Sequence, residues 1–166
     1  MKNIISALLF LIFIFFAGCR QDINYLSDEK KLLVENTTFY DWYGNEIKVA
    51  EFKGKIVIID FWESWCGPCL SAFPGFQRAL NKYPDELVII AATVGWNEGQ
   101  NEAMSFKEST DYDFIYVDGG ELSAKLGFVG IPFKIVLGRD GKVYDWKTGS
   151  NGAASEYDYL TGLISR

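Results

Sequence analysis

The chain has 166 residues, a formal net charge of −6, three cysteines and no histidine. An acidic chain without a run of basic residues lacks the positive surface of a nucleic-acid-binding protein, so we expect no nucleic-acid partner. A closed zinc site takes four Cys or His ligands, which this composition does not supply, so we expect no metal. The length suffices for one domain with a sizeable hydrophobic core.

The N-terminus has the pattern of an export signal. One basic residue, Lys2, precedes an apolar run over residues 4–17 that is interrupted by Ser6. The run is shorter than the roughly 20 residues that cross a bilayer as a helix and is typical of the hydrophobic region of a signal peptide. It ends at residues 16–19, Phe-Ala-Gly-Cys. These residues resemble the lipobox of bacterial lipoproteins, in which the cysteine is lipidated, although Phe16 departs from the usual Leu, Val or Ile.

The lipobox resemblance implies a lipoprotein of the cell envelope, anchored to the membrane on the periplasmic side by a lipid on Cys19. Such a lipid also accounts for the odd number of cysteines, because an unpaired thiol is a liability in an exported protein. The alternatives are an uncleaved N-terminal anchor or an ordinary signal peptide that leaves Cys19 free. We expect a signal peptide over residues 1–18, a polar tether over residues 19–33 and one domain over residues 34–166.

Strands and helices alternate along the expected domain. Short strands over residues 34–40 and 46–49 flank a turn and predict an N-terminal hairpin. β-Branched residues predict a strand over 55–61 that is buried on both faces, and helical spacing of apolar residues predicts a helix over 70–83. The further expected elements are strands over 86–94 and 114–117, helices over 97–109, 121–126 and 154–164, and a hairpin of 134–137 with 142–146. Parallel strands with helical crossovers predict a three-layer α/β/α sandwich.

Residues 65–69, Trp-Cys-Gly-Pro-Cys, separate the buried strand from the helix that follows it. Two cysteines with this spacing can close a small disulfide ring and open it again, which predicts a redox couple. Pro68 suits the first turn of a helix, where its missing N–H has no partner to lose. Cys66 is therefore expected at a helix N-terminus, where free N–H groups stabilise a thiolate. A purely structural disulfide is the alternative, but so short a loop constrains the unfolded chain little.

These residues and their surroundings resemble the thioredoxin superfamily, and within it the membrane-tethered TlpA/ResA-type thiol–disulfide oxidoreductases. Trp-Cys-Gly-Pro-Cys matches the redox centre, Pro74 falls where thioredoxins carry a helix-kinking proline, and Pro132 matches the proline that is cis in the family. Residues 138–142 resemble the closing hairpin. The N-terminal hairpin and the extra segment over about residues 96–118 favour the TlpA/ResA branch. The resemblance implies an α/β thioredoxin-like fold with an inserted helix–strand segment.

The resemblance implies catalytic roles for Cys66, Cys69, Asp60 and Pro132. Cys66 attacks a partner's disulfide, Cys69 resolves the mixed disulfide, and neither step needs a cofactor. Asp60 matches a buried carboxylate of thioredoxin and is expected to take the proton of Cys69. Because no lysine lies in the strand over 88–94 to match its usual partner, we expect burial to raise the pKa of Asp60. The alternative for Asp60 is a carboxylate facing solvent, and for Pro132 a simple loop proline.

Residues around the couple are expected to dock partner proteins: Trp65, Gly67, Pro68, Gly130, Ile131 and Phe133. A cis bond before Pro132 would offer a backbone edge to an extended partner segment. Phe133 stands where this branch commonly has Thr, and we expect it to alter the docking rim. Trp65 has core filling as its alternative role, and Glu63 is expected to be a solvated neighbour.

The predicted function is an exported, membrane-tethered oxidoreductase that reduces disulfides of exported proteins with electrons from a membrane donor. The dipeptide between the cysteines, Gly-Pro, is that of thioredoxin, whose couple lies near about −270 mV on the reducing side. A disulfide oxidase or isomerase with the same couple is one alternative. A lipoprotein binding module that kept the fold without turnover is another. A peroxidase is disfavoured because the motif supplies no Arg- and Thr-rich pocket around a single cysteine.

Overall fold

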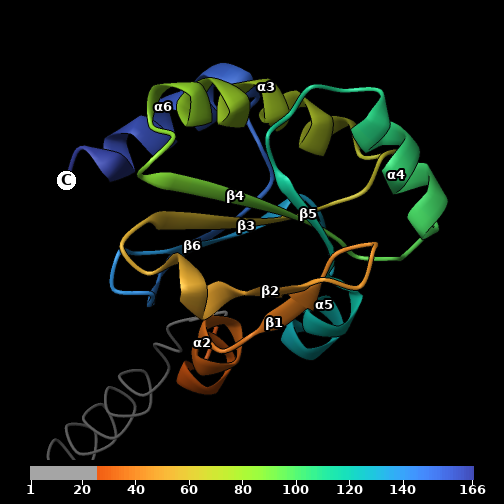
Figure 1. Cartoon of the computed structure of the whole chain (residues 1–166), viewed down its shortest axis with the longest axis horizontal. Coiled ribbons are helices and arrows are strands. Elements are labelled where there is room, and N and C mark those ends of the chain that lie inside the picture. The colour runs from red at the N-terminus through yellow and green to blue at the C-terminus, as the bar shows by residue number, and fades with distance from the viewer. Residues whose placement is uncertain (1–25) are drawn as a thin grey trace, which may run out of the picture.

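Two runs of apolar residues form the centre of the sheet. They are β3 (Ile56–Trp62) and β4 (Leu87–Thr93), and every residue of both strands is buried. The two strands pair in parallel, with Ile56 opposite Leu87 and Trp62 opposite Thr93. Continuous apolar runs of this kind suit strands that are covered on both faces. They belong to a computed structural model of the chain, which describes residues 26–166 (Figure 1).

Within residues 26–166, seven strands form one mixed sheet in the order β2-β1-β5-β4-β3-β6-β7. Next to the parallel pair, β5 is parallel to β4, whereas β6 is antiparallel to β3 and pairs with β7. The other strands are β1 (Thr38–Tyr40), β2 (Glu46–Lys48), β5 (Ile115–Asp118), β6 (Phe133–Leu137) and β7 (Val143–Thr148). The helices are α2 (Asp28–Glu35), the 3₁₀-helix η1 (Val49–Phe52), α3 (Gly67–Lys82), α4 (Gln100–Glu108), α5 (Gly120–Leu126) and α6 (Ala153–Ile164).

The helices form two outer layers. Figure 1 shows α3, α4 and α6 on one face of the sheet and α2 and α5 on the other. The buried side chains divide accordingly, because alternate residues of a strand point to opposite faces. Ile58 and Trp62 of β3 join the core under α3 and α6, and Ile59 and Phe61 join the core above α2 and α5. The predicted three-layer sandwich is confirmed, and the elements expected from residue 46 onward are present with ends shifted by at most three residues.

The beginning of the domain differs from the prediction. The strand expected over 34–40 starts only at Thr38, because residues 28–35 form α2, with Ser27 as its cap. Leu26 and Val34 are fully buried in the core above α2 and α5, which fastens this helix to the domain. The described part of the expected tether, residues 26–33, is thus folded onto the sheet.

The rest of that tether, the expected signal peptide and Cys19 lie outside the described residues. From residue 26 onward, no helix combines the length and the apolar composition needed to cross a membrane.

Candidate active site

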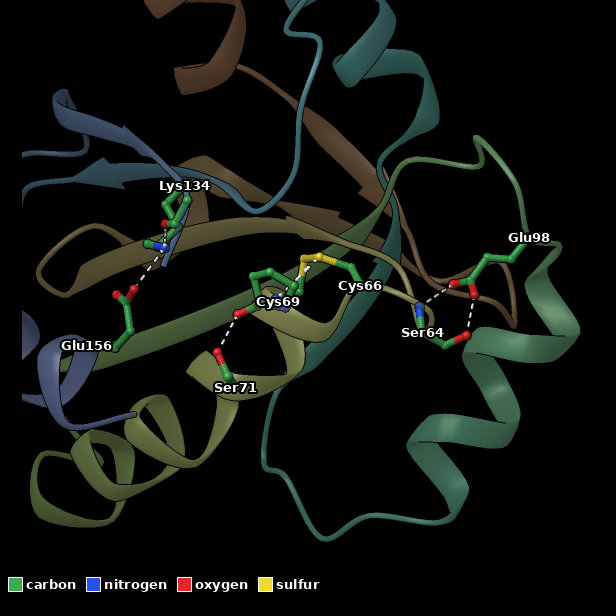
Figure 2. Close-up of a disulfide and its surroundings, with 9 residues drawn as sticks. Ser64, Cys66, Cys69, Ser71, Glu98, Lys134 and Glu156 are labelled. Atoms are coloured by element: carbon green, nitrogen blue, oxygen red, sulfur yellow. Dashed lines mark hydrogen bonds and ion pairs between the residues drawn. A yellow bond between two sulfur atoms is a disulfide. The ribbon is translucent and has the colours of Figure 1, made fainter. Parts of the chain in front are cut away.

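The two cysteines lie where β3 leaves the sheet and α3 begins. Cys66 is the N-cap of α3, its sulfur accepts a hydrogen bond from the backbone N–H of Cys69 at 3.3 Å, and Pro68 stands in the first turn. The two sulfurs form a disulfide, with the Cα atoms 5.2 Å apart (Figure 2). Cys66 keeps 3% of its surface exposed and Cys69 none. Cys66 is therefore the sulfur nearer to solvent, as the predicted order of attack requires.

Two residues within helix α3 shape the helix and its packing against the rest of the protein. Pro74 lies inside the helix and cannot donate a backbone hydrogen bond to the turn before it. The next residue, Gly75, lies so close to α6 that a Cβ atom there would overlap the backbone of Ala153. A glycine is thus required for the two helices to pack at this distance.

The segment before β6 forms the second side of the site. The peptide bond between Ile131 and Pro132 is cis, as expected. Pro132 is buried, its carbonyl oxygen accepts a hydrogen bond from Gly149 N–H at 2.7 Å, and Ile131 packs against the core cluster that contains both cysteines. Gly130 is partly exposed and so remains accessible to a partner.

The rim around the couple differs from the prediction at one position. Trp65 is 52% exposed and Gly67 and Pro68 are exposed, which excludes core filling for the tryptophan. Phe133, however, is 1% exposed, and its ring stacks on Phe128 with centroids 4.4 Å apart. Its side chain therefore fills the core instead of the docking rim, because strand alternation turns it to the face of the sheet away from the cysteines.

Two exposed apolar residues that the sequence analysis missed extend the rim. Trp96 is 40% exposed and Val129 is 93% exposed. The ring of Trp96 contacts the ring of Phe128, with centroids 5.9 Å apart. Val129 follows Phe128 in the sequence. Residues 96 and 129 lie far apart in the sequence, so no local pattern indicated that they belong together.

Asp60 lies under the cysteines and is fully buried. In β3 it stands between Ile58 and Trp62, both of which face the core cluster that contains Cys66 and Cys69. Burial raises the pKa of Asp60 to about 7; the ammonium group of Lys134 opposes this rise and the carboxylate of Glu156 adds to it. The expected raised pKa is confirmed, and the alternative of a carboxylate facing solvent is excluded.

As the sequence indicated, β4 carries no lysine, but Asp60 still has a lysine nearby. The lysine comes from the antiparallel neighbour β6, where Lys134 stands directly opposite Asp60. Its Nζ lies 3.1 Å from Oε1 of Glu156 in α6 and donates a hydrogen bond to the carbonyl oxygen of Gly149 at 2.9 Å (Figure 2). A lysine inside an otherwise apolar strand was the signal that would have found it.

Glu63 is also buried, contrary to the expectation of a solvated neighbour. Its Oε1 accepts a hydrogen bond from the backbone N–H of Trp96 at 3.1 Å. Reciprocally, Glu98 accepts a hydrogen bond from the backbone N–H of Ser64 at 2.8 Å and another from the Ser64 hydroxyl (Figure 2). We call Glu63 and Glu98 the carboxyl clasp, because each carboxylate binds the loop that carries the other.

The carboxyl clasp adjoins the redox centre. The backbone N–H of Cys66 donates a hydrogen bond to the carbonyl oxygen of Glu63 at 3.0 Å. Burial and the adjoining carboxyl group of Glu98 raise the pKa of Glu63 to about 7, while the N–H of Trp96 lowers it. The clasp therefore joins the loop before Cys66 to the loop that presents Trp96 on the rim.

Comparison with known proteins agrees with this arrangement. A family model described as Redoxin matches residues 17–161. Thiol-disulfide oxidoreductase ResA of Bacillus cereus (strain ATCC 10987 / NRS 248) is 29% identical over 143 residues, which are 82% of each chain. Sporulation thiol-disulfide oxidoreductase A of Bacillus subtilis (strain 168) is 30% identical over 110 residues, which are 64% of this chain and 66% of that one. The crystal structure of StoA from Bacillus subtilis has a TM-score of 0.60 at 25% identity and covers 74% of this chain and 94% of its own.

Proposed function

The chain belongs to the Redoxin family as a thiol–disulfide oxidoreductase of the TlpA/ResA type, and from this premise we propose that it reduces disulfides in exported proteins. The observation that carries the proposal is the Cys66–Cys69 pair at the N-terminus of α3. The outer cysteine lies beside an exposed apolar rim, and a buried acid lies on the sheet behind the inner one. This arrangement supports attack on a large partner followed by an internal step that is shielded from bulk solvent.

The reduction begins with the dithiol form. The thiolate of Cys66 attacks one sulfur of the partner's disulfide; a mixed disulfide forms and the partner's other sulfur leaves as a thiolate. Cys69 then attacks the sulfur of Cys66, the mixed disulfide breaks, and the partner's second sulfur leaves. Two electrons have passed to the partner, and the Cys66–Cys69 disulfide remains. A two-electron donor at the membrane returns the couple to the dithiol.

Asp60 serves the second attack. Cys69 is fully buried, so its thiol needs a base within the protein before it becomes a nucleophile. The carboxylate of Asp60 faces the same core cluster and takes this proton through a bridging water. A pKa of about 7 allows a carboxyl group both to accept and to return a proton near neutral pH.

The rim supplies the contact with the partner. Trp65, Trp96 and Val129 expose apolar surface, and an extended partner segment lies along the backbone of Gly130 and Ile131. Backbone hydrogen bonds of this kind give affinity without demanding a particular partner sequence. We therefore propose a protein disulfide in an unfolded or extended segment as the substrate.

Export and membrane attachment are part of the same proposal. They rest on the signal-like residues 1–18 and on Cys19 as the lipidated residue, all of which precede the described part of the chain. Reduction outside the cytoplasm requires the membrane donor, because exported compartments tend to oxidise thiols. The Gly-Pro dipeptide between the cysteines supports the reducing direction, and an oxidase or isomerase is the second candidate.

The reduction potential of the couple tests the direction. The full chain in detergent is equilibrated with thiol buffers and the free thiols are labelled, with the Cys66→Ser/Cys69→Ser variant as the blank. A potential at or below about −250 mV is expected for a reductase. A potential above about −180 mV would make the protein an oxidant or isomerase. The lack of any reversible couple would leave the binding module.

A further inference from the structure

We propose that Lys134 and Glu156 are positioning residues for the thiol–disulfide reaction: Glu156 competes with Asp60 for the single buried ammonium group, and the balance sets how strongly Asp60 holds a proton. The proposal rests on the proposed role of Asp60 as the proton acceptor of Cys69. It assigns functions to two charged side chains that take no part in the sulfur chemistry themselves.

Strand register brings the first two members together. Asp60 and Lys134 are Cα partners in the antiparallel pair of β3 and β6. Side chains that stand directly opposite in such a pair lie on the same face, with Cβ atoms about 5 Å apart. For both residues this face carries α3 and α6, since Val136, two residues beyond Lys134, also faces the cluster of the cysteines. The side chain of Lys134 therefore leaves the sheet beside the side chain of Asp60.

The ammonium group nevertheless bonds elsewhere. Its hydrogen-bond acceptors are Glu156 and the carbonyl oxygen of Gly149, and it lies 5.9 Å from the centre of the Phe76 ring. Both side chains of this ion pair are almost fully buried, with exposed fractions of 1% and 6%. The two oxygens of Asp60 accept no hydrogen bond from any residue between 26 and 166. Glu156 thus holds the ammonium group that Asp60 lacks.

The count of buried charges explains why this matters. Two carboxyl groups and one ammonium group share an environment that bulk solvent does not reach, so full ionisation would leave one uncompensated negative charge. Around Asp60, β4 presents the apolar Ala91 as its partner, α3 presents the two cysteines, β6 presents Lys134 and α6 presents Glu156. The charge that Asp60 experiences is therefore set by Lys134 and Glu156.

The two residues act in opposite directions. Lys134 alone would favour the carboxylate of Asp60 and make it a weak base for a thiol. Glu156 neutralises that ammonium group and restores the affinity of Asp60 for the proton of Cys69. Substituting either residue should therefore move the pH dependence of the resolving step, and the two shifts should have opposite signs.

The test follows the decay of the mixed disulfide between Cys66 and a model disulfide peptide in the full chain, from pH 5 to pH 9. The rate is expected to rise as Asp60 ionises. For Glu156→Gln we expect the midpoint of this rise to move to lower pH by about one unit, because a negative charge has been removed. For Lys134→Met we expect a move of similar size to higher pH.

Three further variants control the experiment. Glu121→Gln breaks the exposed ion pair with Lys125 on α5 and should leave the midpoint unchanged. Glu156→Asp keeps the negative charge and should restore the midpoint of the natural chain. The double variant Lys134→Met/Glu156→Gln removes both members of the buried ion pair together, so position 156 carries no carboxylate without its ammonium group. It remains informative if Lys134→Met alone fails to fold, and its midpoint should lie above that of Glu156→Gln.

The outcomes separate this inference from the proposed function. If Asp60→Asn removes the pH-dependent rise while Glu156→Gln shifts it no further than Glu121→Gln does, the inference is overturned and the role of Asp60 stands. If Asp60→Asn leaves the rise unchanged, the role of Asp60 itself is wrong. Shifts of the same sign in Glu156→Gln and Lys134→Met would also overturn the inference, because a loss of packing alone has no reason to distinguish the two charges.

Discussion

Two buried acids flank the redox centre, and their surroundings differ. Asp60 lies on the sheet beneath the cysteines, where a lysine opposes the effect of burial. Glu63 lies in the carboxyl clasp at the rim, where a backbone N–H opposes it and a second carboxyl group adds to it. Both acids have a pKa raised to about 7. Burial is the main cause of the raised pKa in both acids, and the two differ in the group that opposes it, an ammonium group at Asp60 and a backbone N–H at Glu63.

Because their surroundings differ, we expect Asp60 and Glu63 to have different roles. The proton of Asp60 is placed to take part in the sulfur chemistry, because this carboxyl group faces the cluster that contains both cysteines. Protonation of Glu63 determines whether Glu98 faces a neutral carboxyl group or a second carboxylate across the loops beside Cys66. We therefore expect substitutions at Asp60 to change rates and substitutions in the carboxyl clasp to change local stability.

The largest expected effect comes from Cys69→Ser, which removes the step in which we propose that Asp60 acts. Turnover should fall by at least about 1000-fold and the mixed disulfide on Cys66 should accumulate, because no resolving thiol remains. In this background, Asp60→Asn should have no additional effect on turnover. Mass spectrometry of the trapped complex and insulin reduction measure both results. An additional loss would show that Asp60 acts on Cys66 or on the fold instead.

The next effect separates the two acids directly. Asp60→Asn should slow resolution of the mixed disulfide by about 100-fold, the usual contribution of a general base. Glu63→Gln, which replaces the other buried acid by an amide of equal size, should slow it by less than about threefold. Stopped-flow tryptophan fluorescence gives both rates. Equal losses in the two variants would remove the distinction between the two acids.

Stability should depend on pH through both acids. Their ordinary pKa values are 3.8 for Asp60 and 4.5 for Glu63, and both rise to about 7 in the folded protein. Between these values the folded state binds more protons than the unfolded state, so the free energy of unfolding should decrease as the pH rises from about 4 to about 7. Urea unfolding of the oxidised protein at several pH values measures this slope.

Each acid should contribute to that slope independently. Asp60→Asn and Glu63→Gln should each flatten it, and the double variant should flatten it further, since the two groups share no partner. If the free energy of unfolding of the natural chain increased with pH over this range, the assigned direction of both pKa shifts would be contradicted.

The smallest expected effect concerns the carboxyl clasp. Glu98→Ala removes both hydrogen bonds to Ser64 and should lower the free energy of unfolding by about 2 kcal/mol. Hydrogen exchange should accelerate at the amides of Ser64 and Trp96, while the rate of resolution stays within about twofold. Glu108→Ala, at an exposed position of α4, is the matched control. Unchanged exchange at Ser64 would show that the clasp does not hold this loop.

Local patterns were sufficient to predict the centre of the site. The spacing of Cys66 and Cys69, the apolar run before them and the proline in the first turn are all contained in about 15 residues. The cis bond at Pro132 and the burial of Asp60 followed from the family resemblance together with strand patterns. These features depend on residues close together in the sequence or on a motif that carries its own context.

Contacts between distant segments were not predictable in the same way. Lys134 meets Asp60 only through the register of β6 on β3, and Glu156 reaches Lys134 from α6. Glu63 is buried only because the loop that carries Trp96 and Glu98 folds over it. For Phe133 the alternation within β6 was available, but without the register there was no basis for deciding which face it occupies.

The close contact between Gly75 of α3 and Ala153 of α6 sets the distance between these two helices, away from the reactive groups. Glu156 lies one helical turn beyond Ala153, so the separation of the two helices determines how far its carboxylate extends toward the sheet. A side chain at position 75 would push α6 outward and draw that carboxylate away from Lys134. A substitution at Gly75 is therefore expected to change the proton chemistry that we propose for Asp60, without changing any residue of the active site.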